Sequence, residues 1–479
     1  MTPSSPSPRS PLAPQAPSPS PWSEPSGSDP AAEPPPVVPA QLSRPSATAG
    51  APASAAAPHR VPRGPAAAPP APAATVPTSP KSPATPPTSP ARPGVRPERP
   101  RLVELRLSAF AGHRAVRFPL GPLTVFAGPS GCGKTNALRA YEALARLGGG
   151  AALAEVFPDP AGCVPDRARP DTQRRRGFRI GCTADGPEGL VRLDIAVQAE
   201  PELRIVGERL AAAGGPVLLE TALRDPGRCS VQAAWHTAGS SPVTRAPLPD
   251  DLLGTALLPL HVAGKTDGQR QVLAAAEQMV VALRSVFACD PAPGRMRAAV
   301  PVGDGRLLRG CENLADVLWR TRTECGRRHA QLVSAVRAGC AGPVADVRAE
   351  PLGGGLLRAV LDRGDGPPTG FERLGDGELR YTALALVLLT GPGVLEVDPP
   401  GEVPAALRTL TVLADGLDRG LDVRQRAELL RLAARMCERG HIRFLGTVSD
   451  ASWITGAGGL GEESGAAVAD GITVVHLDA

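Results

Sequence analysis

Residues 128–135 read Gly128-Pro129-Ser130-Gly131-Cys132-Gly133-Lys134-Thr135, which matches the pattern G-x-x-x-x-G-K-[ST]. Glycines let such a loop wrap tightly, so that backbone N–H groups point inward at phosphate oxygens, and the helix that follows adds a favourable dipole. In this pattern the lysine neutralises charge on the β- and γ-phosphates, and the last hydroxyl is offered to Mg²⁺. The spacing therefore predicts a phosphate-binding loop (P-loop) for a nucleotide and Mg²⁺.

The sequence on both sides of this loop supports the prediction. Residues 123–127 form a short apolar run typical of a buried strand, and residues 134–147 have helical spacing and end at three glycines. The alternative is a glycine turn with an incidental lysine. Gly264-Lys265-Thr266 repeats the G-K-T tripeptide, but Pro259 stands where the first glycine is required. We therefore expect an ordinary loop at that second position.

A nucleotide site of this kind also needs a carboxylate on a neighbouring strand to hold Mg²⁺. Residues 394–398 read VLEVD, which predicts a strand over 394–397 with Asp398 at its tip. Asp398 and Thr135 are therefore the candidate metal ligands. Asp398 can also be interpreted as a turn residue at the end of a strand, because two prolines follow it.

The first 100 residues differ in composition from the rest of the chain. They hold 31 of the 57 prolines, interleaved with Ala, Ser and Thr, and they cannot bury enough apolar surface to offset the entropy of ordering. We expect residues 1–100 to be a disordered tail and residues 101–479 to form one large domain. Ser-Pro and Thr-Pro steps in the tail indicate a passive linker or, alternatively, a segment that docks on a protein partner.

The remaining pattern is that of an α/β fold, since strand-like and helical stretches alternate toward the end of the chain. Two helical stretches in the middle, 269–289 and 312–338, predict a helical lobe inserted at about 250–345. The other expected strands are 101–107, 116–118, several within 178–236, 442–446 and 472–477, and the other expected helices are 377–389 and 422–439.

Charge, cysteine content and hydropathy exclude several classes of protein. The first 100 residues hold 8 of the 52 basic and 4 of the 47 acidic residues, so residues 101–479 are nearly neutral. This charge balance argues against a domain whose main task is to bind polyanions. The nine cysteines form no C-x-x-C pair and predict reduced thiols. There is no secretory signal, and the longest apolar run, 381–389, is too short to cross a bilayer. These features predict a cytoplasmic protein that does not span a membrane.

The segment around the loop resembles a known family. GPLTVFAGPSGCGKTN at 121–136, with the strands that precede it, is similar to the start of predicted ATP-binding proteins of the RecF/SMC-like branch of ABC-type P-loop ATPases, a branch of AAA family ATPases. Asn136 also matches. ENLADVL at 312–318 resembles a helix of the inserted lobe, LGDGELR at 374–380 resembles the signature segment, and RFLGTVS at 443–449 resembles the late strand.

The resemblance implies an ABC-type mixed sheet like that of RecF and SMC heads, with ATP and Mg²⁺ as ligands. It implies that ATP on one P-loop is capped by the signature of a second copy, giving an ATP-dependent homodimer. Lys134 and Asp398 would be catalytic, and Thr135 and Asp398 would bind the metal. The nucleotide-binding residues would be Gly128, Ser130, Gly131, Cys132, Gly133, Lys134, Thr135, Asn136, Gly375, Asp376 and Gly377. A simple helix-capping turn is the alternative for residues 374–380.

Three departures from the family pattern concern hydrolysis. Gly375 replaces the signature serine, Pro399 replaces the glutamate that polarises water, and Val448 replaces the switch histidine. Glu396 and Glu402 are the nearest substitutes for the missing acid. Since positioned acid–base catalysis contributes about 10²–10⁴-fold, we expect ATP binding with slow hydrolysis. The alternatives are a pseudo-ATPase that serves as a regulatory module, and a DNA-repair or genome-defence component that contacts nucleic acid.

Overall fold

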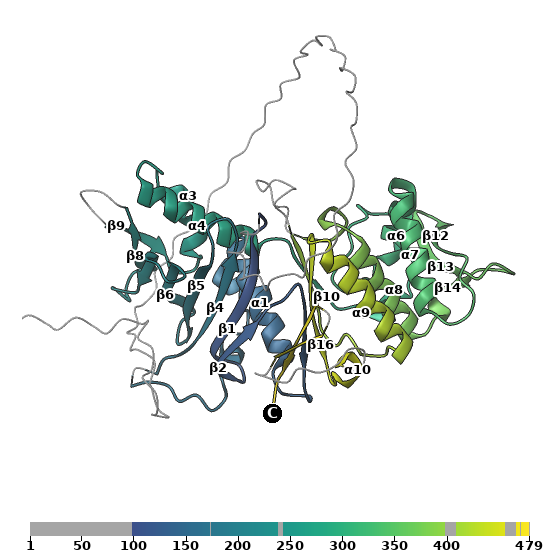
Figure 1. Ribbon diagram of the computed structural model, residues 1–479, viewed down its shortest axis with the longest axis horizontal. Helices are drawn as coiled ribbons and strands as arrows, with labels where there is room; N and C mark the ends of the chain where they lie inside the picture. The colour runs from purple at the N-terminus through teal and green to yellow at the C-terminus, as the bar shows by residue number, and fades with distance from the viewer. Residues whose placement is uncertain are drawn as a thin grey trace, which may run out of the picture. The chain divides into compact units, whose positions relative to one another are not determined.

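The computed structural model describes residues 98–172, 174–237, 243–397, 409–455, 466–469 and 471–478, which form three sheets flanked by helices (Figure 1). The expected tail up to residue 97 lies outside the described residues. So do three residues singled out in the sequence, Asp398, Pro399 and Glu402.

The strands form an eight-stranded antiparallel sheet, a six-stranded sheet and a small third sheet. Their bounds are β1 Arg101–Phe110, β2 His113–Pro119, β3 Leu123–Ala127, β4 Arg176–Asp185, β5 Val191–Glu200, β6 Arg204–Ala212, β7 Val217–Ala222, β8 Ser230–His236, β9 Val243–Pro249, β10 Val286–Cys289, β11 Val300–Pro301, β12 Asp346–Gly353, β13 Leu356–Asp362, β14 Thr369–Gly370, β15 Leu410–Ala414, β16 Ile442–Val448, β17 Ala466–Ala469 and β18 Ile472–His476.

The helices of the described residues follow the same numbering along the chain. Their bounds are α1 Lys134–Gly148, α2 Leu153–Val156, α3 Gly254–His261, α4 Asp267–Leu283, α5 Pro293–Met296, α6 Leu314–Glu324, α7 Gly326–Gly339, α8 Asp376–Leu389, α9 Val423–Glu438 and α10 Ser452–Thr455, with 3₁₀ turns at Ala161–Cys163, Phe371–Arg373 and Pro392–Val394.

The six-stranded sheet has the order β10-β15-β16-β3-β18-β17 and is parallel apart from β17. All residues of β3, β15 and β16 are buried, because helices cover both faces of the sheet and leave no polar side. Parallel strands end at one common edge, so the segments that follow β3, β15 and β16 come together there.

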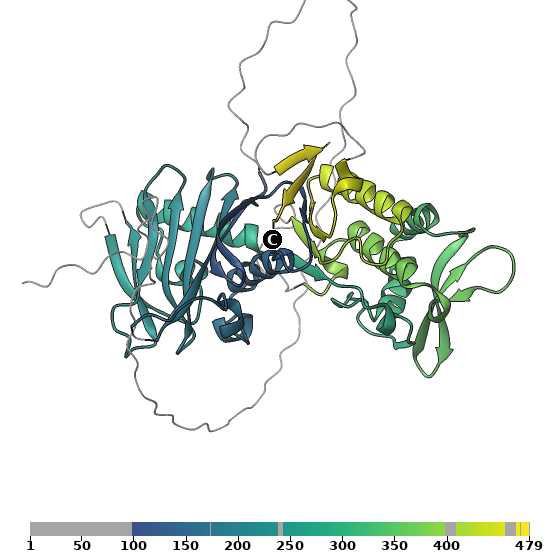
Figure 2. The same cartoon turned by 90° about the horizontal axis from the view of Figure 1, so that it is seen from below.

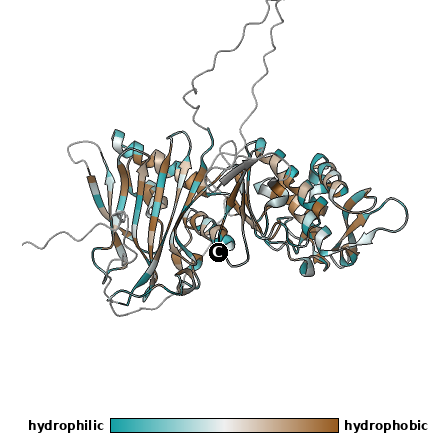
Figure 3. Cartoon of the chain, turned by 60° about the horizontal axis from the view of Figure 1, so that its bottom comes forward, coloured by the Kyte–Doolittle hydropathy of each residue, from teal (hydrophilic) through white to brown (hydrophobic). Residues whose placement is uncertain are grey.

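The eight-stranded sheet has the order β2-β1-β4-β5-β6-β7-β8-β9, and each neighbouring pair is antiparallel. Side chains alternate along its strands, so that one face carries apolar residues such as Leu193 and Ile195 and the other carries polar ones such as Arg192 and Asp194. The alternation of brown and teal along these strands is visible in Figure 3. The apolar face packs on α1 and α4.

Helix α1 lies between the two large sheets, and α8 and α9 cover the opposite face of the parallel sheet (Figure 2). Leu144 of α1 belongs to the core that includes Ile180 of the antiparallel sheet and Phe126 of β3. Val125, the neighbour of Phe126, belongs instead to the core of α8 and α9, because successive side chains of a strand point to opposite faces. Residues 128–135, which follow β3, therefore lie at the junction of two cores.

The structure confirms most of the expected elements and corrects three. The expected helix over 269–289 ends at Leu283, and residues 286–289 form β10 after Ser285 adopts φ 59°. The expected helix over 312–338 is interrupted at Cys325 and becomes α6 and α7. The expected strand over 394–397 was wrong, since a 3₁₀ turn over Pro392–Val394 is followed by a single bridge between Leu395 and Leu307.

The helices between 250 and 345 contact different parts of the fold. Helix α4 packs on the antiparallel sheet, whereas α7 packs on α8 and α9, and β10 between them joins the edge of the parallel sheet. The domain boundaries given above stay a prediction. All nine cysteines are free in the structure. None of the helices in the described ranges combines the length and apolar character needed to cross a bilayer.

Candidate nucleotide-binding site

The loop between β3 and α1 owes its shape to glycine. Gly131 and Gly133 have φ angles of 89° and 97°, in the left-handed region that favours glycine. A Cβ atom on Gly128 would lie 2.2 Å from the carbonyl oxygen of Leu477, and one on Gly133 would lie 2.7 Å from the ring of His113. Glycine is therefore required at both ends of the loop, which brings the chain tightly round in front of the first turn of α1.

The ring of His113, carried by β2, holds the end of this loop. Its Nε2 lies 3.0 Å from the carbonyl oxygen of Gly133, and the side chain is buried. Burial lowers the pKa of His113, so at neutral pH the uncharged ring donates to that carbonyl. The positive charge beside the loop is therefore supplied by Lys134.

The ammonium group of Lys134 lies across the loop. Its Nζ donates to the carbonyl oxygens of Gly128 and Pro129, each at 2.7 Å, and lies 3.6 Å from the sulfur of Cys132. The lysine thus sits where the loop closes, at the start of a fifteen-residue helix. An anion bound by the loop amides and the helix N-terminus would meet this charge.

A carboxylate from a distant part of the chain faces the threonine of the motif. The hydroxyl of Thr135 donates to Oδ1 and Oδ2 of Asp415, at 3.1 Å and 3.0 Å. Asp415 directly follows β15, and it also accepts from the hydroxyl of Thr447 on β16 at 2.6 Å. Thr447 in turn accepts from the N–H of Gly416 at 2.7 Å, so its side chain fixes both Asp415 and the turn that follows it.

The chemistry of this pair fits Mg²⁺. Hydroxyl and carboxylate oxygens are hard ligands, and Mg²⁺ in nucleotide sites takes one or two protein carboxylates together with waters and substrate phosphates. The described residues contain no group of three or more His, Cys, Asp or Glu side chains arranged around a common metal position. Thr135 and Asp415 supply two oxygen atoms of the kind that Mg²⁺ takes beside phosphate and water.

Sequence reasoning placed the metal carboxylate at Asp398, which lies outside the described residues, and its assignment stays a prediction. Among the described residues Asp415 is the carboxylate that Thr135 contacts. A sequence signal for Asp415 was present, since residues 410–414 read LTVLA, a β-branched apolar run that ends at an acid. With Asp415 in this role, the next residue is Gly416 rather than an acid.

Val448, which stands at the position of the switch histidine in the family pattern, is not placed to contact a ligand. Val448 is fully buried at the end of β16 and packs in the core of α8 and α9. Its side chain therefore cannot reach a ligand at the sheet edge. The next residue, Ser449, is exposed at that edge.

The second predicted group, Gly375, Asp376 and Gly377, forms the N-terminus of α8. Gly375 is the N-cap, and its N–H donates to the carboxylate of Glu378 at 3.3 Å. Asp376 accepts from Arg297 at 2.6 Å. A Cβ atom on Gly377 would lie 2.4 Å from the carbonyl oxygen of Gly420, whereas one on Gly375 would meet no atom within 4 Å.

Within the described part of the chain, no hydrogen bond or ion pair joins this helix start to the loop of residues 128–135. A buried arginine of α8 connects this helix instead to the turn that follows Asp415. Arg380 of α8 is 4% exposed, and it donates to the carbonyl oxygens of Pro291 at 2.7 Å and Gly416 at 3.3 Å. Burial lowers the pKa of Arg380, and the two carbonyls compensate in part for the lost hydration.

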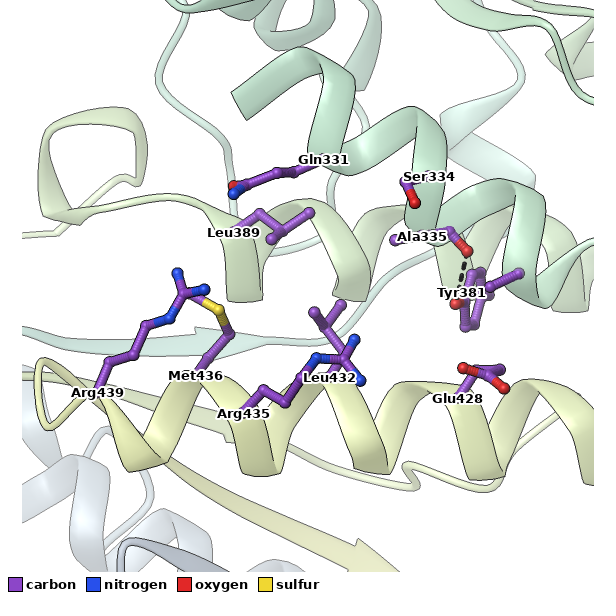
Figure 4. A pocket seen from close by; sticks show the side chains of 11 residues that line it. Gln331, Ser334, Ala335, Tyr381, Leu389, Glu428, Leu432, Arg435, Met436 and Arg439 are labelled. Carbon is purple, nitrogen blue, oxygen red and sulfur yellow. Dashed lines mark hydrogen bonds between the residues drawn. The ribbon is translucent and has the colours of Figure 1, made fainter. Parts of the chain in front are cut away.

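A small pocket of about 200 Å³ lies elsewhere, between α7, α8 and α9 (Figure 4). Leu389, Leu432 and Met436 supply its apolar wall, and Arg435 and Arg439 lie along its α9 side. None of the predicted site residues lines this pocket, so it is separate from the loop at the sheet edge.

No protein-family model and no curated protein sequence matches this chain. Solved structures of SMC heads are similar to it in part. One of them is an SMC head bound to the C-winged helix domain of ScpA. It is 12% identical to this chain, the match covers 78% of this chain and 96% of the SMC head chain, and the TM-score is 0.40.

Two further SMC heads give comparable values. The SMC head domain from Thermotoga maritima is 13% identical over 73% of this chain and 89% of that chain, with a TM-score of 0.34. An SMC head domain with an extended coiled coil, bound to the C-terminal domain of ScpA derived from Pyrococcus furiosus, is 9% identical over 78% and 95%, with a TM-score of 0.35. Similarity at this level says nothing about ligands, and the site rests on its own geometry.

Proposed function

We propose that this chain binds Mg-ATP at residues 128–135 and hydrolyses it slowly. One observation carries the proposal: the hydroxyl of Thr135, in the first turn after the glycine loop, donates to both oxygens of Asp415 at the carboxyl edge of the parallel sheet. A local glycine turn does not require a carboxylate from 280 residues away, whereas a metal bound to a nucleotide does. When bound, Mg²⁺ would neutralise phosphate charge between these two side chains.

In this proposal the chain's own groups have separate tasks. The loop amides and the N-terminus of α1 bind the phosphates, and Lys134 supplies a positive charge to them. Thr447 orients Asp415 through the hydrogen bond at 2.6 Å. The uncharged ring of His113 holds the carbonyl of Gly133 by a hydrogen bond and so fixes the end of the loop.

Isothermal titration of the full chain with ATP and Mg²⁺ tests binding. Lys134→Ala should weaken binding by about 100-fold or more. Lys265→Ala is the matched control, because it removes the only other lysine of a G-K-T tripeptide. Equal affinity in wild type and Lys134→Ala would contradict the proposal.

The start of α8 supports an ATP-dependent homodimer as part of the same proposal. Its first N–H groups lack partners within the helix and, in a second copy, would be free to bind the γ-phosphate. Gly375→Trp should block dimer formation while sparing ATP binding, because position 375 has open space around its Cβ atom. Gly377 is unsuitable for this test, since any side chain there would collide with Gly420. Light scattering with and without Mg-ATP gives the readout.

A second candidate function is that of a pseudo-ATPase whose nucleotide is a structural or regulatory ligand. The observation that favours it is the absence of an acid directly after Asp415, where Gly416 stands. Phosphate release by wild type, with Lys134→Ala as the blank, separates the two functions. A role with nucleic acid, the cytoplasmic location and a partner for the tail stay predictions from the sequence.

A further inference from the structure

The residue after Asp415 cannot activate water, so hydrolysis needs another acceptor near the γ-phosphate. Phosphoryl transfer to water requires a group that orients the attacking oxygen and accepts its proton. Such a group must lie at the carboxyl edge of the parallel sheet, beside the loop that holds the phosphates. The segments that follow β10, β15, β16 and β18 supply the candidate carboxylates. Asp290, after β10, is the farthest of them from β3 and pairs with Arg380 and Arg419.

Asp418 lies over the end of β16. Its Oδ2 accepts from the backbone N–H of Ser449 at 2.9 Å and also from the Ser449 hydroxyl. Ser449 directly follows β16, the strand between β15 and the P-loop strand β3. Because neighbouring strands are about 4.8 Å apart, a side chain bound at the end of β16 lies one strand spacing from the start of the loop.

The turn that carries Asp418 is fixed to the same strand. Gly416 adopts φ 61°, which reverses the chain, and the N–H of Leu417 donates to the carbonyl oxygen of Thr447 at 2.8 Å. The side chain of Leu417 is buried in the core. In the described part of the chain the second oxygen of Asp418, Oδ1, makes no hydrogen bond. The carboxylate is thus held by one oxygen and can use the other.

The other acids near this edge of the sheet either accept hydrogen bonds from the backbone or lie on another side of β3. Asp422 caps α9 by accepting from the N–H of Gln425 at 2.7 Å, and Asp450 accepts from the N–H of Ser452 at 2.9 Å. Asp478 is exposed after β18, on the other side of β3, and is the one real competitor among these acids.

We propose that Asp418, positioned by Ser449, is the carboxylate that orients and deprotonates the attacking water. This inference rests on the proposed function and deepens it. The water oxygen forms a bond to the γ-phosphorus while the bond from that phosphorus to the β–γ bridging oxygen breaks, and the electron pair leaves with ADP. The proton of the water passes to Asp418, which later releases it to solvent with inorganic phosphate. Ser449 is a positioning residue, because it acts through Asp418.

The test measures ATP affinity by titration and kcat by phosphate release in the full chain. Asp418→Asn should keep the affinity within about twofold and lower kcat by about 100-fold or more, since positioned acid–base catalysis contributes about 10²–10⁴-fold. Ser449→Ala should lower kcat less, with little change in KM, and Ser449→Thr should restore it by returning the hydroxyl. Asp450→Asn is the matched control, because it changes the acid directly after Ser449 and should leave kcat unchanged.

Three results would overturn the inference. The first is an unchanged kcat in Asp418→Asn, and the second is a loss of kcat in Asp478→Asn instead. The third is wild type that binds ATP but releases no phosphate above the Lys134→Ala blank. Failure of wild type to bind ATP would instead be a failure of the proposed function, so the two are distinguished. Thermal unfolding of each variant shows whether it is folded.

Discussion

The tripeptide G-K-T occurs twice in this chain, and the two copies differ in their hydrogen-bond partners and in their positions in the fold. Thr135 donates to Asp415, which lies 280 residues away and directly follows β15. Thr266 accepts from the N–H of Gln269, three residues on, and so caps α4, and its hydroxyl donates to the carbonyl oxygen of Thr237. Lys134 lies across a glycine loop, whereas Lys265 is exposed on a segment without helix or strand, as expected. The same residue types therefore serve a shared site in one place and a local helix start in the other.

The physical difference lies in what precedes each copy. The first follows a buried strand of the parallel sheet, which delivers it to the edge where β15 and β16 also end. The second follows α3, whose Pro259 lies inside the helix. A glycine loop that meets a distant carboxylate has the parts of a nucleotide and metal site, whereas Thr266 meets only backbone groups, the N–H of Gln269 and the carbonyl of Thr237.

The largest expected difference is between the two lysines. Lys134→Ala should weaken ATP binding by about 100-fold or more, because hydrogen bonds to charged groups contribute about 1.5–3 kcal/mol each and the lysine serves two phosphates. Lys265→Ala should leave the affinity unchanged. Titration calorimetry at fixed Mg²⁺ measures both, and equal losses would end the distinction between the two copies.

Substitution of the two threonines should change two different properties, ATP affinity for Thr135 and stability for Thr266. Thr135→Ala should lower ATP affinity about tenfold in Mg²⁺ and have no effect in EDTA, because the lost hydroxyl is a metal ligand. Thr266→Ala should leave ATP affinity unchanged and lower the free energy of unfolding by about 1 kcal/mol or more, since it removes an N-cap and the hydrogen bond to the carbonyl of Thr237. Titration and urea unfolding of both variants test this, and a Mg²⁺-independent effect of Thr135→Ala would refute the metal assignment.

A smaller effect is expected from the histidine beside each copy, His113 at the first and His261 at the second. Burial lowers the pKa of His113 below the ordinary value of 6.5, so the unfolded chain binds more protons. Stability is therefore retained above pH 6.5 and lost as pH falls through it, by at most about 1.4 kcal/mol at pH 5.5.

Replacing His113 with Gln should flatten this part of the pH dependence of unfolding. His261→Gln is the matched control, because His261 is exposed at the end of α3. Urea unfolding at pH 7.5 and 5.5 provides the comparison. An identical pH dependence in wild type and His113→Gln would show that the ring does not titrate as its burial requires.

The smallest effect should come from removing residues 1–97. Tail composition predicts that this segment contributes to neither copy of the tripeptide, so melting temperature and ATP affinity should stay the same. The truncation keeps Arg99, whose guanidinium donates to the carbonyl oxygen of Gly440 at 3.3 Å. Loss of soluble protein on truncation would show that residues 1–97 are needed for folding.

The amino-acid sequence alone was sufficient for features that depend on short spacing. The strand before the glycine loop and the helix after it were both predicted within residues 123–147, and the structure confirms them. Backbone conformation there is decided by neighbours: glycine permits the left-handed turns of Gly131 and Gly133, and the apolar run favours a buried strand. The rejection of residues 264–266 succeeded for the same reason.

Only the tertiary structure identified the carboxylate partner. Two short segments, 394–398 and 410–415, each read as an apolar run ending in aspartate, and sequence reasoning chose the first. Which run reaches Thr135 depends on strand order, because β16 lies between β15 and β3 and sets the position of both. Strand order is decided by pairing between segments hundreds of residues apart, and local spacing carries no information about it. The glycine loop is thus a local property of the chain, whereas the contact between Thr135 and Asp415 and the position of Asp418 beside Ser449 are products of the assembled sheet.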